Sequence, residues 1–196
     1  MDLKDIEKNY EGMSDEKIIR IATTDAVGLP PEVFEIIEKE IKKRNLNPDI
    51  LKGAFAQNKE YSIDEIENYS NLLRDLPCPI CENTIEKLNG TILHTVKSFI
   101  FFTTSSAETT IACPDCLDKK NNDAIFSTAL LGWWGIPWGL FKTPIYIYRN
   151  YKEKKENRLS VSNNTLLLYT LNHIGEIETY KANTEKLKEI IQRRNY

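Results

Sequence analysis

The chain has 196 residues, of which 41% are hydrophobic and 28% are charged, and its formal net charge is -3. This composition suits one folded domain or two small ones, and it excludes a wholly disordered chain and a strongly basic nucleic-acid-binding protein. Four cysteines are too few for a disulfide-dense secreted scaffold. The first residues contain no apolar secretion signal, so we expect a cytoplasmic protein with reduced thiols.

Charge is spread unevenly along the chain. Residues 1–76 carry 11 basic and 17 acidic side chains, whereas residues 149–196 carry 10 basic and 6 acidic ones. Together with changes in residue pattern, this predicts three segments. They are a helical region at 1–76, a small antiparallel β segment at 77–123 that contains the four cysteines, and an apolar Trp-rich segment with carboxy-terminal helices at 124–196. The expected fold class is therefore α+β.

Caps, breakers and apolar stripes mark the helices of the first segment. Ser14 is a suitable N-cap for one helix, and residues 28–31 (Gly-Leu-Pro-Pro) separate it from the next. The second helix carries an apolar stripe made of Val33, Phe34, Ile36, Ile37 and Ile41. A third helix is predicted from Ser62 or Asp64 to Leu73.

The sequence between the cysteine pairs predicts three antiparallel strands. The Asn-Gly pair at 89–90 is a strong signal for a two-residue hairpin turn between strands at 84–88 and 91–102. Residues 103–107 predict a polar turn that leads into a short strand at 108–112. Later helices are predicted at 117–131, 165–172 and 184–194.

Two CPxC knuckles contain the four cysteines, which are Cys78, Cys81, Cys113 and Cys116. Each knuckle can place two thiolates on the same side of an ion, so two knuckles supply the four corners of a tetrahedron. The intervening 31 residues exceed the spacing of compact zinc sites, and antiparallel strands would return the chain to its start. Four thiolates close the coordination sphere, which predicts one structural Zn²⁺ per chain without a catalytic role.

Other interpretations of the cysteines stay open. They could be four buried apolar residues, or thiols for redox exchange, although redox motifs usually begin a helix within a βαβ unit and this segment lacks that pattern. Iron shares the four-thiolate ligand set. His94 and His173 are interpreted as ordinary polar residues, although His94 is a further candidate ligand.

Between Ala124 and Tyr148 the only charged residue is Lys142. The aromatic residues of this stretch suit a membrane interface, and the basic residues that follow suit anionic headgroups. Because two prolines and three glycines oppose a spanning helix, we expect two helices that lie in the interface or form a shallow re-entrant pair. A buried core or a partner groove is favoured over membrane contact for this segment. The candidate docking residues are Trp133, Trp134, Trp138, Tyr146, Tyr148, Arg149, Lys152, Lys154 and Lys155.

Residues 77–150 resemble uncharacterised bacterial zinc-ribbon proteins. The resemblance rests on the two CPxC knuckles, the Thr-rich and aromatic stretch between them, and Gly-Trp-Trp-Gly-Ile-Pro-Trp-Gly at 132–139, a GWWG-x-PWG pattern. It implies a metal-binding ribbon with a membrane-associated segment and no enzymatic activity. Residues 10–46 resemble a small two-helix module of bacterial proteins that ends in E-x-x-x-R-N/G-L, here Glu40 to Leu46.

These features favour a non-enzymatic zinc-ribbon adaptor, an interaction module whose partner is an unknown protein or an anionic membrane surface. A nucleic-acid-binding ribbon is an alternative, because Phe99, Phe101 and Phe102 could stack on bases, but the ribbon lacks a basic face. A thiol redox protein is another. The sequence contains no nucleophile elbow, P-loop, HExxH or dinucleotide fingerprint, so we expect no enzyme.

Overall fold

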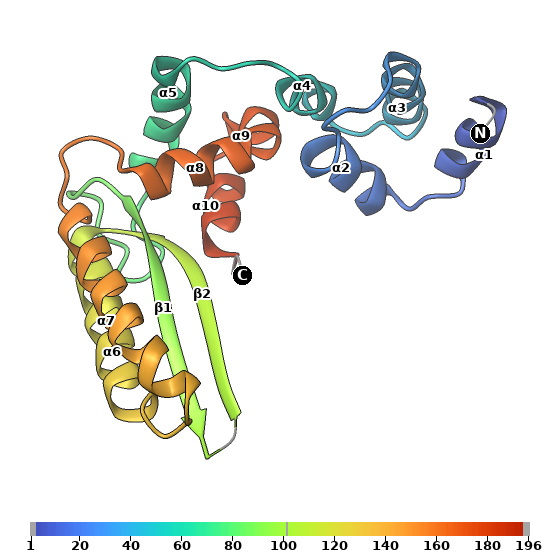
Figure 1. The fold of residues 1–196 in the computed structure, drawn as a ribbon. Helices are drawn as coiled ribbons and strands as arrows, with labels where there is room; N and C mark the ends of the chain where they lie inside the picture. Colours follow the sequence, from blue (N-terminus) through green and yellow to red (C-terminus); the bar gives the residue numbers. More distant parts are fainter. Residues whose placement is uncertain (1–2, 101, 194–196) are drawn as a thin grey trace. The chain divides into compact units, whose positions relative to one another are not determined.

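The computed structural model describes residues 3–100 and 102–193, which form mainly helices and one two-stranded antiparallel hairpin near the cysteines (Figure 1). The α+β prediction is confirmed in this broad form. In chain order the elements are α1 (Leu3–Glu11), α2 (Asp15–Thr24), α3 (Pro31–Lys43), α4 (Asp49–Ala56), α5 (Ile63–Arg74), β1 (Asn89–Phe99), β2 (Phe102–Ala112), α6 (Pro114–Leu131), α7 (Trp138–Glu156), α8 (Asn164–Asn172), α9 (Ile174–Tyr180) and α10 (Thr184–Gln192).

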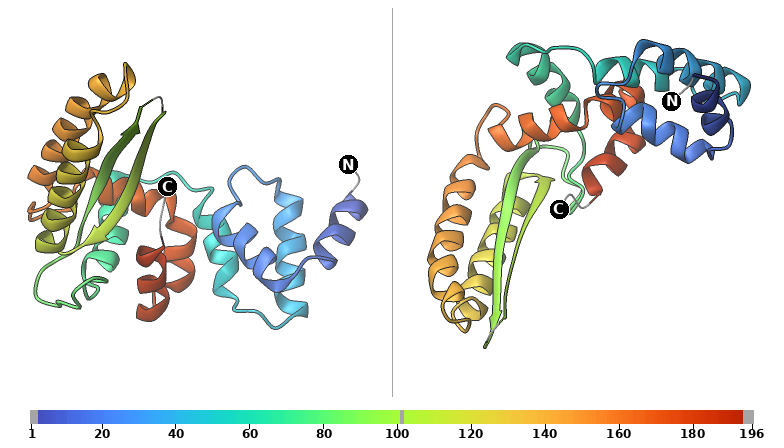
Figure 2. Two further views of the ribbon diagram at one scale, coloured as in Figure 1. Left: turned by 90° about the horizontal axis from the view of Figure 1, so that it is seen from below. Right: turned by 45° about the vertical axis from the view of Figure 1, so that its right-hand side comes forward.

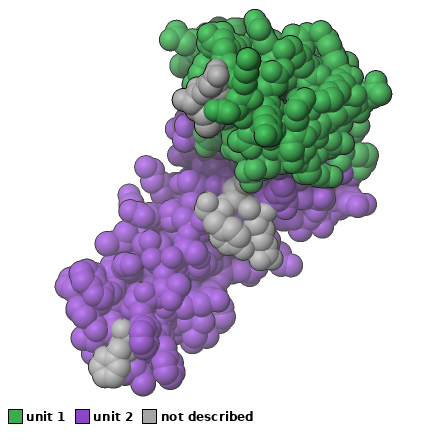
Figure 3. Space-filling model, turned by 90° about the vertical axis from the view of Figure 1, so that its right-hand side faces the viewer, with its two compact units in different colours: residues 1–69, 170–187 green, residues 70–169, 188–196 purple. Residues whose placement is uncertain are grey.

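The chain divides into two compact units (Figure 3). The first contains residues 1–69 and 170–187, and the second contains residues 70–169 and 188–196. Both the ribbon expected at 77–123 and the Trp-rich part of the next segment belong to the second unit.

The first unit is built from short helices around an apolar core. The hydroxyl of Ser14 caps α2 by accepting a hydrogen bond from the backbone N–H of Lys17 at 3.4 Å, as predicted. The apolar stripe of α3 points into the core. Buried residues of the core are Tyr10, Ala22, Ala26, Val33, Ile36, Ile37, Ile41, Ile50 and Ala54.

The E-x-x-x-R-N/G-L pattern ends α3 and ties it to the loop before α2. The guanidinium of Arg44 contacts the buried carboxylate of Glu40 at 2.6 Å and donates to the backbone carbonyl of Met13. Asn45 has a φ of 53°, which Asn and Gly adopt most readily. The backbone N–H of Leu46 then closes the helix end on Ile41 at 3.0 Å. The pattern is thus a helix stop combined with an ion pair.

Helices α4 and α9 pack at unusually short range within the first unit. A Cβ atom at Gly53 would lie 2.1 Å from the hydroxyl oxygen of Thr179 and 2.4 Å from the carbonyl oxygen of Gly175. Glycine is therefore required where the helices cross. Neither helix was predicted, because both are short and lack strong caps.

The hairpin differs from the predicted three strands. Its two strands have 11 residues each and pair in register from Asn89 opposite Ala112 to Phe99 opposite Phe102. The turn therefore follows Phe99, and the Asn-Gly pair at 89–90 lies in β1 instead of forming a turn. Residues 84–88 form no strand, and the expected polar turn at 103–107 lies within β2.

Asn89 and Gly90, which the sequence predicts to form a turn, make tertiary contacts instead. The buried amide of Asn89 donates to the carbonyl of Val161 at 3.2 Å, and its side-chain oxygen accepts from the backbone N–H of Asn163 at 2.9 Å. Gly90 lies so close to α8 that a Cβ would be 2.9 Å from the backbone nitrogen of Leu166. Tertiary contacts, and not a turn, therefore require asparagine and glycine at these two positions.

The outer edge of β1 is covered by side chains instead of a third strand. The amide of Asn150 in α7 bonds both backbone groups of His94, at 2.8 Å to the N–H and 2.6 Å to the carbonyl. The amide of Asn163 bonds both backbone groups of Gly90. Thr128 of α6 accepts from the backbone N–H of Val96 at 3.2 Å. These side chains satisfy the edge and hold β1 against α6 and α7.

The turn of the hairpin carries a strained apolar residue. Ile100 has a φ of 45°, in the left-handed region that β-branched residues avoid at a cost of about 1–2 kcal/mol. Tight hairpin turns usually place Asn or Gly at such positions. Here an exposed isoleucine takes that place.

We predict that Asn150→Ala destabilises the second unit by about 2–4 kcal/mol, because it leaves both backbone groups of His94 without their buried partner. Urea unfolding followed by tryptophan fluorescence measures this, since all three tryptophans lie in this unit. Asn122→Ala, which removes an exposed amide oxygen that accepts from Lys154, is the control and should stay within about 0.5 kcal/mol of the unaltered protein. Equal midpoints for the two variants would contradict the edge-covering role.

Candidate metal centre and docking segment

The first knuckle is a tight turn after α5. The backbone N–H of Glu82 donates to the carbonyl of Cys78 at 2.9 Å, and the N–H of Cys78 donates to the carbonyl of Asn83 at 2.9 Å. Glu82 has a φ of 59°, which lets the chain turn back after Cys81. Both sulfurs of this knuckle thereby face one side of the loop.

The second knuckle joins the hairpin to α6. Cys113 follows the last residue of β2 and is the N-cap of α6, with Pro114 in the first helical turn. The backbone N–H of Leu117 donates to the carbonyl of Cys113 at 3.0 Å. Since Ala112 pairs with Asn89, the hairpin brings the second knuckle back beside the start of β1 and thus beside the first knuckle.

The four cysteine sulfurs converge on one point. They all lie within 4.8 Å of one another, and the sulfurs of Cys81 and Cys113 are 3.6 Å apart. A zinc ion bound at about 2.3 Å from four sulfurs would hold them roughly 3.8 Å apart, so the spacing fits a tetrahedral site. All four cysteines are free of disulfides, Cys78 and Cys113 are buried, and Cys81 is exposed. The sequence prediction of a four-cysteine metal-site geometry is confirmed.

The protonation of the thiols shows why this cluster suits a cation. Burial tends to raise the pKa of Cys78, but hydrogen bonds from nearby backbone amides, with that of Cys113 foremost, outweigh burial and lower the pKa to about 7. Burial raises the pKa of Cys113 to about 11, and burial with the neighbouring thiols also raises the pKa of Cys116. Four thiolates at this distance repel one another, and a divalent cation removes that penalty.

The second knuckle begins helix α6, which starts three residues earlier than the predicted helix at 117–131. The position is one that thiol redox motifs also use, because a helix N-terminus favours a thiolate. Here the helix follows an antiparallel hairpin and the other knuckle lies within 4.8 Å, so the geometry presents four thiols together instead of one isolated pair.

Neither histidine belongs to this cluster. His94 packs edge-on against the ring of Tyr146 with the ring centroids 5.5 Å apart, and burial followed by the charge of Arg149 lowers its pKa. His173 in the first unit pairs through Nδ1 with the carboxylate of Glu176 at 2.9 Å. Among the described residues, only the four cysteines form a group that could hold a metal.

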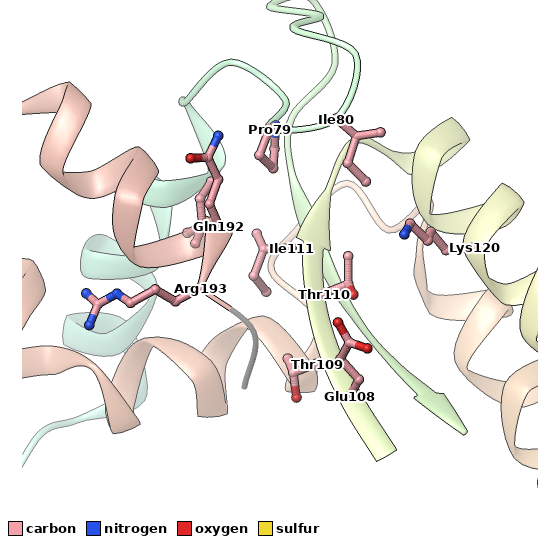
Figure 4. Close-up of a pocket in the computed structure, with 10 residues that line it drawn as sticks. Pro79, Ile80, Glu108, Thr109, Thr110, Ile111, Lys120, Gln192 and Arg193 are labelled. Carbon is pink, nitrogen blue, oxygen red and sulfur yellow. The ribbon is translucent and has the colours of Figure 1, made fainter. Parts of the chain in front are cut away.

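A small pocket of about 170 Å³ lies beside the first knuckle (Figure 4). Pro79 and Ile80 of the knuckle border it together with four residues of β2, and the side chain of Ile80 is 47% exposed. Lys120, Gln192 and Arg193 approach it from α6 and from the end of α10. The metal centre is therefore close to the surface on this side.

The Trp-rich segment forms two helices joined by a turn. Helix α6 ends at Leu131, and α7 begins at Trp138 and continues through Pro144 to Glu156. Across residues 3–100 and 102–193, no helix has both the length and the apolar character needed to cross a membrane. The expected pair of helices joined by a turn is present, and their placement in a membrane interface stays a prediction.

Most of the predicted docking residues are exposed, so the buried-core interpretation of this segment is wrong. Trp134 is 69% exposed, Trp138 is 64% exposed and Trp133 and Tyr148 are also on the surface. The basic residues Arg149, Lys152 and Lys155 are exposed, and Lys154 is partly covered. Tyr146 is also partly covered. Arg149 lies over the ring of Tyr146, and Lys155 lies over the ring of Tyr151.

The glycines of the GWWG-x-PWG pattern explain how the tryptophans reach the surface. A Cβ at Gly132 would lie 2.2 Å from the hydroxyl oxygen of Thr143, and one at Gly135 would lie 2.2 Å from that of Thr103 in β2. The glycines pack inward against α7 and the hairpin, and the bulky residues between them point outward. The aromatic residues are evident from the sequence, whereas the packing role of the glycines depends on contacts with Thr143 and Thr103, which are distant in the sequence.

No protein-family model, curated protein or solved structure matches this chain.

We predict that zinc affinity falls as the pH is lowered through neutrality. The raised pKa values of Cys113 and Cys116 mean that these thiols are protonated without metal, so binding must release protons. Calorimetric titration in buffers of different ionisation enthalpy would measure the released protons. Binding that releases none would contradict a thiolate site.

We further predict that Cys113→Ser weakens zinc binding at least about 100-fold, because it removes a buried ligand from the closed site. Competition with a chromophoric chelator measures the affinity. The control is Asp115→Asn, which keeps every thiol and alters only an exposed residue of the same knuckle that pairs with Arg158. Its affinity should stay close to that of the unaltered protein.

Proposed function

We propose that this protein is a non-enzymatic zinc-ribbon adaptor in which one structural Zn²⁺ holds the second unit in a form suited to docking. The observation that carries the proposal is the convergence of four cysteine sulfurs within 4.8 Å. Four thiolates leave no coordination position for a substrate or a water molecule, which supports a structural role.

The architecture around the cysteines supports a stabilising role for the ion. A two-stranded hairpin is marginally stable alone, and the knuckles flank its base, where β1 starts and β2 ends. The same site contains the first turn of α6. A metal ion here would join the turn after α5, the hairpin and α6, and its binding free energy would contribute directly to folding.

The docking partner in this proposal is a membrane surface, reached by a cytoplasmic protein through its Trp-rich segment. Exposed tryptophans and the basic residues after Tyr148 support this choice, because both prefer the interface of an anionic bilayer. The resemblance of residues 77–150 to zinc-ribbon proteins with a membrane-associated segment points the same way.

Thiol redox exchange is the second candidate. It is favoured by the place of Cys113 at the start of a helix and by the lowered pKa of Cys78. Nucleic-acid binding has less support. Phe99 and Phe102 are exposed, and Phe101 lies outside the described residues, but the second unit offers no matching run of cations along the ribbon.

Native mass spectrometry of the purified full chain tests the proposal. We expect a mass increment of one zinc per chain, and we expect chelation to abolish the cooperative unfolding of the second unit, followed by tryptophan fluorescence. A metal-free chain with an unchanged unfolding transition would contradict it. Fast alkylation of just two cysteines in metal-free protein, with reversible formation of a disulfide, would instead support the redox candidate.

A further inference from the structure

Two turns that are distant in the sequence lie at the same end of the second unit. The hairpin turn after Phe99 and the turn between α6 and α7 are neighbours in Figure 1 and in both views of Figure 2. The close approach of Gly135 to Thr103, and of Gly139 to the hydroxyl oxygen of Ser98, joins the two turns directly. Lys142 of α7 also donates to the hydroxyl of Ser105 at 3.2 Å.

Both turns expose large apolar side chains at this end. Phe102 is 77% exposed, Ile136 is 76% exposed and Phe99 is 74% exposed. We call the combined surface the apolar tip and define it by Phe99, Ile100, Phe102, Trp133, Trp134, Ile136 and Trp138. Exposed apolar side chains that gather from two segments often mark a surface for binding a protein or a membrane.

Details of the tip suit a hydrocarbon environment. The indole N–H of Trp134 donates to the carbonyl of Leu130 at 3.0 Å, so the ring carries no unpaired donor outward. Ile100 keeps a left-handed backbone that Asn or Gly would adopt without strain. The chain thus maintains an apolar residue at the outermost turn against its local backbone preference.

The charged residues nearest the tip along the sequence are positive. Residues 97–107 and 124–152 contain four basic side chains and no acidic one, and we call Lys97, Lys142, Arg149 and Lys152 the basic collar. Lys97 is two residues from the tip, and Arg149 lies about 16 Å along α7 from Trp138. Phosphate and carboxylate headgroups complement such a collar, whereas a neutral apolar groove of a protein would not require it.

We propose that the hairpin turn and the GWWG-x-PWG turn act as one insertion device that enters the outer part of an anionic bilayer, with the basic collar at the headgroups. This rests on the proposed membrane docking and extends it, because the hairpin turn becomes half of the contact. The tip inserts without crossing, and the metal centre stays outside at the opposite end of α6, which is about 27 Å long.

Ile100→Asn is the decisive variant. It removes an apolar side chain from the tip and relieves the strained backbone, so the variant should unfold at an equal or higher urea concentration than the unaltered protein. A folding defect therefore cannot account for weaker binding. Ile85→Asn is the matched control, because Ile85 is an even more exposed isoleucine, 90% against 55% for Ile100, in the loop between the first knuckle and β1.

The zinc-loaded full chain is tested by sedimentation with vesicles of phosphatidylcholine, with or without phosphatidylserine. We expect partition into the phosphatidylserine vesicles to be at least about tenfold stronger, and to weaken as salt is raised. Ile100→Asn should lower that partition about fivefold or more, and Ile85→Asn should leave it unchanged.

The outcomes separate this inference from the docking on which it rests. If the unaltered protein binds neither vesicle, both fail. If it binds anionic vesicles and Ile100→Asn binds them equally well, docking by the Trp-rich segment survives and the two-turn device is wrong. Lipid-independent dimerisation of the unaltered chain that Ile100→Asn abolishes would assign the tip to a second copy and would also overturn the inference.

Discussion

The convergence of four sulfurs at the base of the hairpin is the constraint on which the second unit depends. Each knuckle belongs to a different piece of chain, and only the return of β2 to the start of β1 brings them together. Mutual repulsion of thiolates would open such a cluster. The attraction of all four thiolates to a divalent cation would outweigh that repulsion. A single ion would thus fix the end of the first knuckle, both strand ends and the start of α6.

The rest of the second unit compensates for the small size of its sheet. Two strands cannot enclose a core, so α6 and α7 supply it, with Val96 and Leu117 among the fully buried side chains. The amides of Asn150 and Asn163 complete the hydrogen bonds of β1 in the manner of a missing strand. Helix α7 therefore contributes both to the core and to the hydrogen bonds of β1, and the segment before α8 completes those hydrogen bonds.

Sequence patterns predicted what depends on neighbouring residues and failed where distant ones decide. The Ser14 cap, the proline start of α3 and the cysteine spacing all have local physical causes. Asn89 and Gly90 fit a turn equally well by local chemistry, and only their contacts with residues 161–166 place them in a strand. The apolar turn at Ile100 could not be predicted, because its backbone conformation opposes the usual residue preference.

The two ends of helix α6 carry side chains of very different chemistry. The helix begins at a thiol cluster that could hold a metal ion and ends next to exposed aromatic side chains. With the proposed ion, we expect the maturation of a newly made chain to be ordered in time: metal capture would come first, because the ion would hold α6 and the hairpin at their base before the aromatic end takes its form. Cells short of zinc would then accumulate chains with loosely held tryptophans, and such chains would be prone to self-association and proteolysis.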